Sequence, residues 1–334
     1  MFNAIFTIIG TVIGAGFASG KEIFTFFSVY GKYGILGLIL TFIIIFITIY
    51  KSFRIIIEYN VCSYSDFVKV FFCKSNFFST VMCNIIDIFL FISFIVMISA
   101  FGSYFSQEFG IPSIFGSILI ATLSFFVFLG NIDMVSRINF YIIPCLIIVI
   151  ILLGSKNMDC FNVATFYSSN AFLSWIISAI LYAGYNLVVL LPILVSLKKY
   201  ISNLHCVGFV SILSSLTLFI LSLILFFLLN HYFYQIKNID LPTVYIASNL
   251  SFFYKYSCGI SILGAIFTTA ISSGYAFLDS FNKKNSKSLF RIALTLCFSS
   301  ILFSNIGFST LLNLLYPLLG IIGFLEVLLI LIKH

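Results

Sequence analysis

The sequence predicts an all-α polytopic membrane protein with ten transmembrane helices, arranged as an inverted repeat of five helices plus five. Three observations support this fold class. The chain is 62% hydrophobic and 8% charged with a mean hydropathy of +1.20, which excludes a soluble domain. Apolar runs long enough to cross a bilayer recur along its whole length. Two glycine-containing interruptions lie about 170 residues apart, at corresponding places in the two halves.

The ten apolar runs are separated only by short polar segments, so we expect one transmembrane transport domain over residues 1–334. The first repeat is expected at about 1–156 and the second at about 168–334. The first run lacks a basic start and a small-residue cleavage site, and we expect it to be a span rather than a signal peptide. The predicted spans are 2–27 (interrupted), 35–51, 80–105, 111–130, 138–155, 171–197, 206–229, 258–279, 289–307 and 310–332.

The distribution of Lys and Arg predicts the orientation of the spans. With the amino terminus in the cytoplasm, twelve of the 17 basic residues fall in cytoplasmic loops or at the carboxyl end and four fall outside. Short cytoplasmic loops normally carry this excess. We therefore expect both termini to be cytoplasmic, as an even number of spans requires. The net charge of +7 is informative about this orientation and does not indicate a nucleic-acid partner.

The first interruption contains four glycines between Gly10 and Gly20 and is followed directly by Lys21 and Glu22. Unpaired backbone at membrane depth occurs only inside protein or along a watery cavity, so a broken helix here indicates a site for a solute or ion. We expect the first half to end near Ile13. Small-residue helix packing is the alternative explanation of the glycines.

The second half of this span is expected to begin at Ser19, because Ser19 and Glu22 have the spacing of a capping box. Carbonyls at the end of one half and amides at the start of the other would suit a cation and an anion, respectively. A zwitterionic amino acid with a sodium ion would match both. Glu22 is either the cap partner, a substrate contact or a candidate proton relay.

The second interruption lies in the sixth span, where Gly184 is flanked by Tyr182, Tyr185 and Asn186. One glycine among polar and aromatic residues is a weak signal by itself. Its position in the second half corresponds to that of the first interruption. We therefore predict that helix 6 is also broken mid-membrane.

The eighth span supplies hydroxyl groups at helical spacing. Thr268 pairs with Ser272, and Thr269 with Ser273, each four residues apart on one helix face. Such oxygens suit a small cation when they are combined with backbone carbonyls. The alternative is that these hydroxyls bond to their own helix or to a neighbour.

Three acidic residues lie within or near apolar spans, where charge is costly and therefore indicates function. Asp87, beside Asn84, is the stronger candidate for a proton or ion relay. Asp279 is expected to pair with the lysines that follow it. Glu326 either acts as a relay or anchors packing near the inner surface.

Two loops are expected to contain short helices. Residues 64–72 form an amphipathic pattern that predicts a helix along the cytoplasmic membrane surface. Pro242 predicts a helix start in the extracellular segment 231–257, which forms either an outer lid or an ordinary connection.

No motif indicates an enzyme. The chain has no HExxH sequence, no P-loop and no Ser-His-Asp set, and its three histidines lie at span ends or at the terminus. The eight cysteines are scattered without a CxxC pair. We expect no catalytic residues, no organic cofactor, no metal site other than sodium and no nucleic-acid partner.

The segment from Gly10 to Ile23, GTVIGAGFASGKEI, resembles the opening signature of the YkvI-type bacterial membrane proteins. These are permeases of the amino acid–polyamine–organocation superfamily, with the LeuT-type five-plus-five fold. The signature covers about 14 residues, and the ten-span plan extends the likeness more loosely over the chain. This sequence departs from it at Lys21, where the family usually has Gln.

The resemblance implies a sodium site between spans one and eight. Its ligands would be the carbonyls of Gly10 and Ile13 with the hydroxyls of Thr268 and Thr269, or a register shifted to Ser272 and Ser273. Span five lacks the interior lysine that proton-coupled relatives use, which favours sodium. The substrate would lie against the breaks, near Ala15, Gly16, Phe17, Ala18, Ser19, Gly20, Tyr182, Gly184, Tyr185 and Asn186.

Together these observations predict a secondary transporter of the bacterial cytoplasmic membrane for an amino acid or similar small polar solute, working by alternating access and coupled to sodium. A proton-coupled carrier using Asp87 or Glu22 is one alternative. A membrane-embedded receptor subunit, similar to spore germinant receptors, would bind its ligand without moving it. A channel would need a continuous polar stripe, and polarity is instead concentrated at the breaks and span eight. The sequence does not predict the oligomeric state.

Overall fold

The computed structural model describes residues 1–71, 76–156, 171–201, 204–237, 239, 241–284, 289–304 and 308–333. The secondary structure of these residues is entirely helical. The helices are α1 (Phe2–Val12), α2 (Ala15–Ala18), α3 (Lys21–Phe26), η1 (Ser28–Tyr30), α4 (Lys32–Glu58), α5 (Tyr64–Phe71), α6 (Asn76–Phe109), α7 (Ser113–Leu129), α8 (Asn131–Ser155), α9 (Ala171–Ser196), η3 (Leu197–Tyr200), α10 (Leu204–His231), α11 (Phe233–Ile236), α12 (Pro242–Leu250), α13 (Phe252–Lys284), α14 (Leu289–Phe303) and α15 (Phe308–Ile332).

Six of the described helices are long and apolar enough to cross a membrane: Lys32–Glu58, Thr80–Ser106, Asp133–Ser155, Ser174–Tyr200, His205–His231 and Phe252–Phe281. Four shorter apolar helices, Phe2–Val12, Ser113–Leu129, Leu289–Phe303 and Leu319–Ile332, fall where the remaining spans are predicted. The total of ten spans stays a prediction. The division into repeats at 156 and 168 also stays one, since 157–170 lie outside the described residues.

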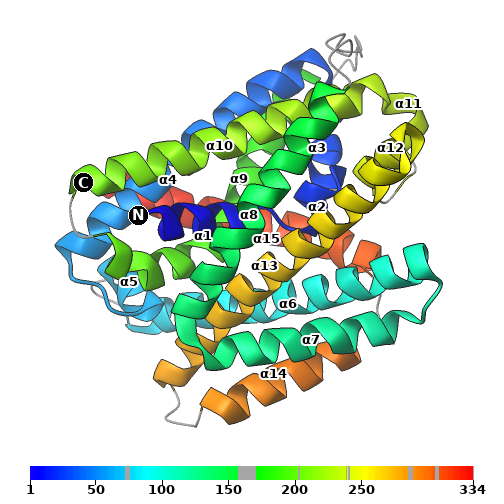
Figure 1. Ribbon diagram of the computed structural model, residues 1–334. Coiled ribbons are helices and arrows are strands. Elements are labelled where there is room, and N and C mark those ends of the chain that lie inside the picture. The colour runs from blue at the N-terminus through cyan, green and yellow to red at the C-terminus, as the bar shows by residue number, and fades with distance from the viewer. Residues whose placement is uncertain are drawn as a thin grey trace.

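The helices α1 and α9 lie in the interior of the bundle (Figure 1). Contacts between α9 and α15 are the most extensive, followed by those of α6 with α13 and of α4 with α9. The helix α9 is the most enclosed of the six long spans, with 83% of its apolar window buried, against 28% for α8. Both chain ends lie on one side of the bundle with α5, and α11 and α12 lie on the opposite side (Figure 1).

The predicted break in helix 6 is wrong, because α9 runs without interruption from Ala171 to Ser196. Gly184 is instead a place of close helix approach. A Cβ at Gly184 would lie 2.5 Å from the carbonyl oxygen of Gly320 in α15, and a Cβ at Gly323 would overlap the carbonyl oxygen of Gly184. The glycine therefore lets two helix backbones touch, as small residues do in membrane bundles.

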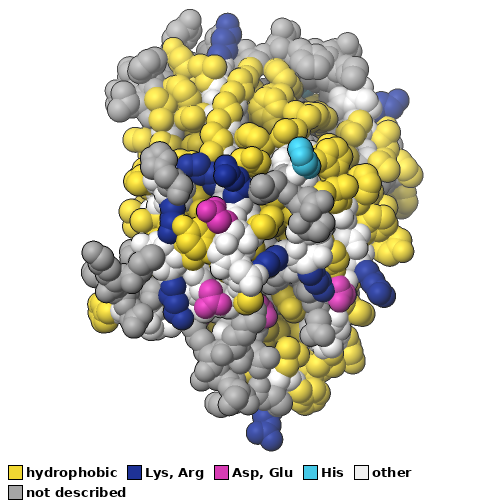
Figure 2. Space-filling view, turned by 90° about the vertical axis from the view of Figure 1, so that its left-hand side faces the viewer, with side chains coloured by type: hydrophobic (Ala, Val, Ile, Leu, Met, Phe, Trp, Pro, Cys, Tyr) yellow, Lys and Arg dark blue, Asp and Glu magenta, His cyan; other side chains and the backbone are white. Residues whose placement is uncertain are grey.

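Both predicted loop helices are confirmed. The helix α5 spans Tyr64–Phe71, and α12 begins at Pro242 with the proline in its first turn. Figure 2 shows the side of the molecule that carries α5, with Lys and Arg side chains gathered at its centre and hydrophobic side chains around them. The orientation predicted from the loops stays a prediction.

Candidate functional site

The first span is broken twice, and the breaks divide it into α1, α2 and α3. The first break lies at Ile13 and Gly14, where Ile13 adopts φ −80° and ψ 82° and ends α1. The Gly14 amide donates to the Val12 carbonyl at 3.0 Å, and α2 begins at Ala15. The predicted interruption is therefore present, and the first half ends as expected.

The carbonyls at the end of α1 meet a hydroxyl group of α13. Thr269 Oγ1 lies 3.1 Å from the carbonyl oxygen of Gly10 and 3.1 Å from that of Ile13. A hydroxyl has one proton and can donate it to only one carbonyl at a time, but its oxygen remains an acceptor. Three hard oxygens from two helices thus converge at the first break, which is the ligand chemistry of a small cation.

The other predicted hydroxyls of α13 differ in their contacts. Thr268 Oγ1 donates to the Ala265 carbonyl at 3.0 Å, and Ser273 Oγ donates to that of Thr269 at 2.9 Å, so both bond within their own helix. Ser272 is fully buried, and its hydroxyl has no hydrogen-bond partner among the described residues. The structure therefore brings Thr269 to the carbonyls of α1 and leaves Ser272 as the buried hydroxyl with unused capacity.

The second break lies at Ser19 and Gly20, and the predicted capping box is wrong. Ser19 ends α2, and its Oγ donates to the Gly16 carbonyl at 3.2 Å. Gly20 is the residue before α3 and has φ +78°, in the left-handed region that glycine adopts without strain. Gly20, and not Ser19, is the residue that precedes α3. Glu22 therefore does not form the predicted capping box with Ser19.

No helix begins at Ser19: α2 begins at Ala15, four residues before the predicted start, and α3 begins at Lys21, two residues after it. The amides of Ala18 and Ser19 already donate to the carbonyls of Gly14 and Ala15, each at 2.9 Å. Gly14 precedes α2 in an extended conformation with φ −89° and ψ −169°. The first amides of α2, those of Ala15 to Phe17, are the ones that no intrahelical bond uses.

Glu22 is buried at 1% exposure and faces α9 rather than Ser19. The hydroxyl of Tyr185 donates to Glu22 Oε1 at 3.5 Å. Tyr182, one turn earlier, is fully buried, and its ring lies 5.1 Å from that of Phe27 in an edge-to-face arrangement. The residues predicted from the two interruptions therefore do meet, although α9 is unbroken.

Asn186 does not reach the first span in this arrangement. Its side-chain amide donates to the Tyr182 carbonyl within α9 at 2.9 Å. Asp87 also lies apart from the breaks, since its Oδ1 accepts a hydrogen bond from Ser280 of α13 at 2.6 Å. The relay roles of Asp87 and Glu22 stay predictions.

Two residues at the site were not predicted. Asn139 of α8 is fully buried, and a Cβ on Gly10 would lie 2.8 Å from its Oδ1. Neither polar atom of Asn139 has a hydrogen-bond partner among the described residues. A buried amide without partners is costly and indicates a polar site beside the first break. Asn139 was missed because it stands at the second position of the predicted fifth span, where a polar residue looks interfacial.

The other missed residue is Thr243 of α12. Its amide donates to the Ser19 carbonyl and its hydroxyl to the Ala18 carbonyl, each at 3.0 Å. Lys21 Nζ donates to the carbonyl of Ile239 at 2.8 Å, just before α12. The segment 231–257, expected to be either an outer lid or an ordinary connection, is therefore hydrogen-bonded to the second break. Pro242 predicted where α12 begins, but nothing in the sequence predicted that Thr243 would bond to the second break.

No protein-family model matches the chain. The membrane protein YkvI of Bacillus subtilis (strain 168) is 25% identical over 332 residues, covering 95% of this chain and 91% of the relative. The protein YyaD of the same organism is 25% identical over 319 residues, with the same coverage.

Two solved structures have the same arrangement of helices. The crystal structure of MhsT in complex with L-phenylalanine superposes with a TM-score of 0.73 at 15% identity, covering 99% of this chain and 88% of that one. A Na⁺-coupled sialic acid symporter gives a TM-score of 0.67 at 13% identity, covering 96% and 76%. The predicted resemblance and fold class are thus confirmed: the chain is similar to YkvI and YyaD, and its helices have the LeuT-type arrangement.

Proposed function

We propose that this protein is a secondary active transporter that carries an amino acid or similar small polar solute by alternating access, with sodium as the coupling ion. The observation that carries this proposal is the contact of Thr269 Oγ1 with both the Gly10 and Ile13 carbonyls. These are the two carbonyls and one of the hydroxyls expected of a sodium site. The LeuT-type fold and a Na⁺-coupled neighbour support the same ion.

The ion site in this proposal is shared between α1 and α13. Gly10, Ile13 and Thr269 supply oxygens directly, and Thr268 joins them by turning its hydroxyl away from the Ala265 carbonyl. Ser272, one helical turn from Thr268 in α13, is an alternative hydroxyl ligand for the same ion. A cation bound there would be coordinated by the two carbonyls and the Thr269 oxygen, while the hydroxyl keeps its proton and turns it away, so sodium is expected to hold the first break against α13.

The substrate in this proposal lies between α2 and α9. The unused amides at Ala15, Gly16 and Phe17 suit a carboxylate. Ala18, Ser19 and Gly20 form the outer wall with Thr243, and Tyr182, Gly184, Tyr185 and Asn186 belong to the facing helix. MhsT was solved with L-phenylalanine, and this supports an amino acid as the class of substrate.

The orientation in this proposal places both termini and α5 in the cytoplasm of a bacterium and α12 outside. The basic residues on the α5 side support it (Figure 2). The second break then faces the extracellular side, where α12 covers it. Release of the bonds from Thr243 and Lys21 would open that side of the site.

The test measures thermal stabilisation of the purified protein by amino acids, with sodium or choline as the cation. We expect one class of amino acid to stabilise the protein only with sodium, by about 2.7 kcal/mol at a concentration one hundred times its Kd. Thr269→Val should abolish the sodium dependence. Ser261→Ala is the matched control, since that hydroxyl bonds only to the Ser257 carbonyl within α13.

The outcomes separate the alternatives. Stabilisation that follows pH and ignores sodium would contradict the ion site and favour a proton-coupled carrier. Sodium-dependent binding without uptake into proteoliposomes would favour a receptor of the same fold. Uptake that Thr269→Val leaves sodium-dependent would show that the ion binds elsewhere.

A further inference from the structure

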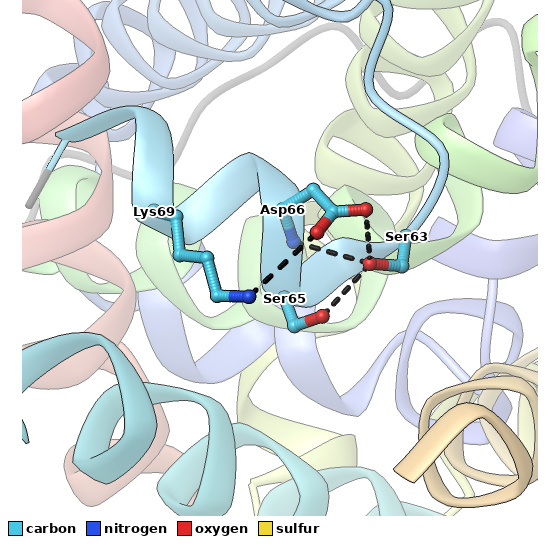
Figure 3. Close-up of polar contacts among 4 residues, drawn as sticks. All are labelled: Ser63, Ser65, Asp66 and Lys69. Carbon is cyan, nitrogen blue, oxygen red and sulfur yellow. Dashed lines mark hydrogen bonds and ion pairs between the residues drawn. The ribbon is translucent and has the colours of Figure 1, made fainter. Parts of the chain in front are cut away.

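The helix α5 has local polar contacts in its first turns. Ser63 Oγ accepts a hydrogen bond from the Asp66 amide at 3.1 Å and donates to Asp66 Oδ2 at 2.6 Å, which caps the first turn. Lys69 lies 3.9 Å from Asp66 one turn later (Figure 3). These contacts all lie on one side of α5. The opposite side buries Tyr64, Phe67 and Val68.

The buried side of α5 is joined to α15 by a hydrogen bond between two enclosed side chains. Tyr64, 4% exposed, donates its hydroxyl to Oε1 of Glu326, which is 5% exposed. Burial and the neighbouring Glu326 carboxyl raise the pKa of the Tyr64 hydroxyl well above its usual value. Tyr64 therefore remains a hydrogen-bond donor over the physiological range of pH.

The second oxygen of Glu326 is in a different position. Glu326 Oε2 is buried and has no hydrogen-bond partner among the described residues. A cavity of about 20 Å³ has the Glu326 side chain in its lining, and only apolar atoms face this cavity, so it offers the carboxylate no polar partner. Apart from Tyr64 and Glu326, the side chains that line it are hydrophobic and come from α5, α6, α9 and α15.

No basic side chain of the described residues forms an ion pair with Glu326. The two nearby lysines bond to backbone carbonyls instead. Lys51 of α4 donates to the Leu331 carbonyl at 2.8 Å, and Lys333, near the carboxyl terminus, donates to the Val70 carbonyl. The titratable groups of α6 that act on Tyr64 are Cys83 and Asp87, which are neighbouring negative charges when ionised. The part of α9 that lines the cavity contributes Leu191.

An ionised Glu326 carboxylate in this place would have one hydrogen-bond donor, Tyr64, and no counter-ion among the described residues, so ionising it is costly. We propose that Glu326 is a proton-binding site whose occupancy is linked to the docking of α5: it holds a proton while α5 covers it and releases the proton to water when α5 swings away. Only the O–H bond of the acid forms or breaks. Tyr64 keeps its proton and bonds to Oε1 in the docked state.

Linkage fixes the sign of the effect. Because the docked state binds one more proton than the undocked state, acid favours docking and alkali favours release of α5. The ratio of undocked to docked protein should rise on the order of tenfold for each unit of pH over the range where the two states differ in protonation. This link requires neither sodium nor substrate, so it stands apart from the proposed transport activity.

The experiment follows hydrogen exchange of residues 61–71 in the full-length protein in lipid nanodiscs, from mildly acidic to mildly alkaline pH. Exchange of the unfolded chain at each pH corrects for the chemistry of the reaction. We expect protection of α5 to fall as pH rises in the wild type. Glu326→Gln, which is neutral at every pH, should keep α5 protected throughout.

Asp87→Asn is the matched control, because it removes the other buried carboxyl group of this region, on α6. It should leave the pH dependence in place. Infrared spectra of the wild type over the same range should show a protonated carboxyl band that Glu326→Gln lacks. Protection of α5 that is constant with pH in the wild type, pH dependence that survives Glu326→Gln, or dependence that Asp87→Asn abolishes would each overturn the proposal.

Discussion

The first span has four glycines between Gly10 and Gly20, and α9 has one glycine, Gly184, at the corresponding place in the other half of the chain, yet only the first span is broken. At Gly14 and Gly20 the backbone leaves the helix, and Gly20 adopts a left-handed conformation. At Gly184 the helix continues and the missing side chain makes room for the backbone of α15. The comparison teaches that glycine in a membrane helix serves either conformational freedom or close approach.

The largest effect is expected for a substitution at the α9–α15 contact. A Cβ on Gly323 would overlap the carbonyl oxygen of Gly184, and a backbone group cannot turn aside as a side chain can. Gly323→Ala should destabilise the protein by about 3 kcal/mol or more. The measurement is the thermal midpoint and the yield of monodisperse protein in detergent.

The control for this contact is Gly208→Ala in α10, since a Cβ at Gly208 meets no atom within 4 Å. That variant should be neutral or more stable by up to about 1 kcal/mol, because alanine favours helix. Equal midpoints for the two variants would contradict the close-approach explanation.

An intermediate effect is expected at the second break. Gly20→Ala places a Cβ at φ +78°, which costs about 1 to 2 kcal/mol, and crowds Leu229 and Thr243 at 3.0 to 3.2 Å. Gly110→Ala separates the two causes, because Gly110 has φ +66° with open space around it. Thermal midpoints should fall more for Gly20→Ala. If the two variants lose the same stability, contact with α12 contributes nothing.

The smallest effect is expected for Lys21→Met, which removes the bond from Nζ to the Ile239 carbonyl. The loss should be about 1 kcal/mol, and it should be local to the outer cover. Hydrogen exchange of α12 would report it as faster exchange. Lys32→Met carries the same charge change at the start of α4, and it should leave α12 unaffected.

The local sequence pattern was sufficient to predict those structural features that depend only on residues close in the sequence. The end of α1 at Ile13 follows from the glycine run that comes after it. The helix α5 follows from its amphipathic pattern, and the start of α12 follows from Pro242. Predicting that Gly10 and Ile13 meet Thr269 required the family resemblance as well. The contacting residues are 259 and 256 positions apart in the sequence.

The features that were missed depend on partners far along the chain. The role of Gly184 is set by Gly320 and Gly323, and nothing beside Gly184 distinguishes a break from a contact. Ser19 matched a capping pattern, but the bond from Thr243 holds its carbonyl and Gly20 provides the turn. Asn139 is buried only because α1 packs against it, and its own sequence neighbours do not indicate that contact.

The backbone contact between Gly184 and Gly323 constrains how this molecule can move. Side chains at an ordinary helix interface can change rotamer and allow sliding, but two backbones in contact have no such tolerance. We therefore expect α9 and α15 to move as one rigid body. The hinges for any opening and closing then belong to the first span, at Ile13–Gly14 and Ser19–Gly20, where the chain already departs from helical geometry.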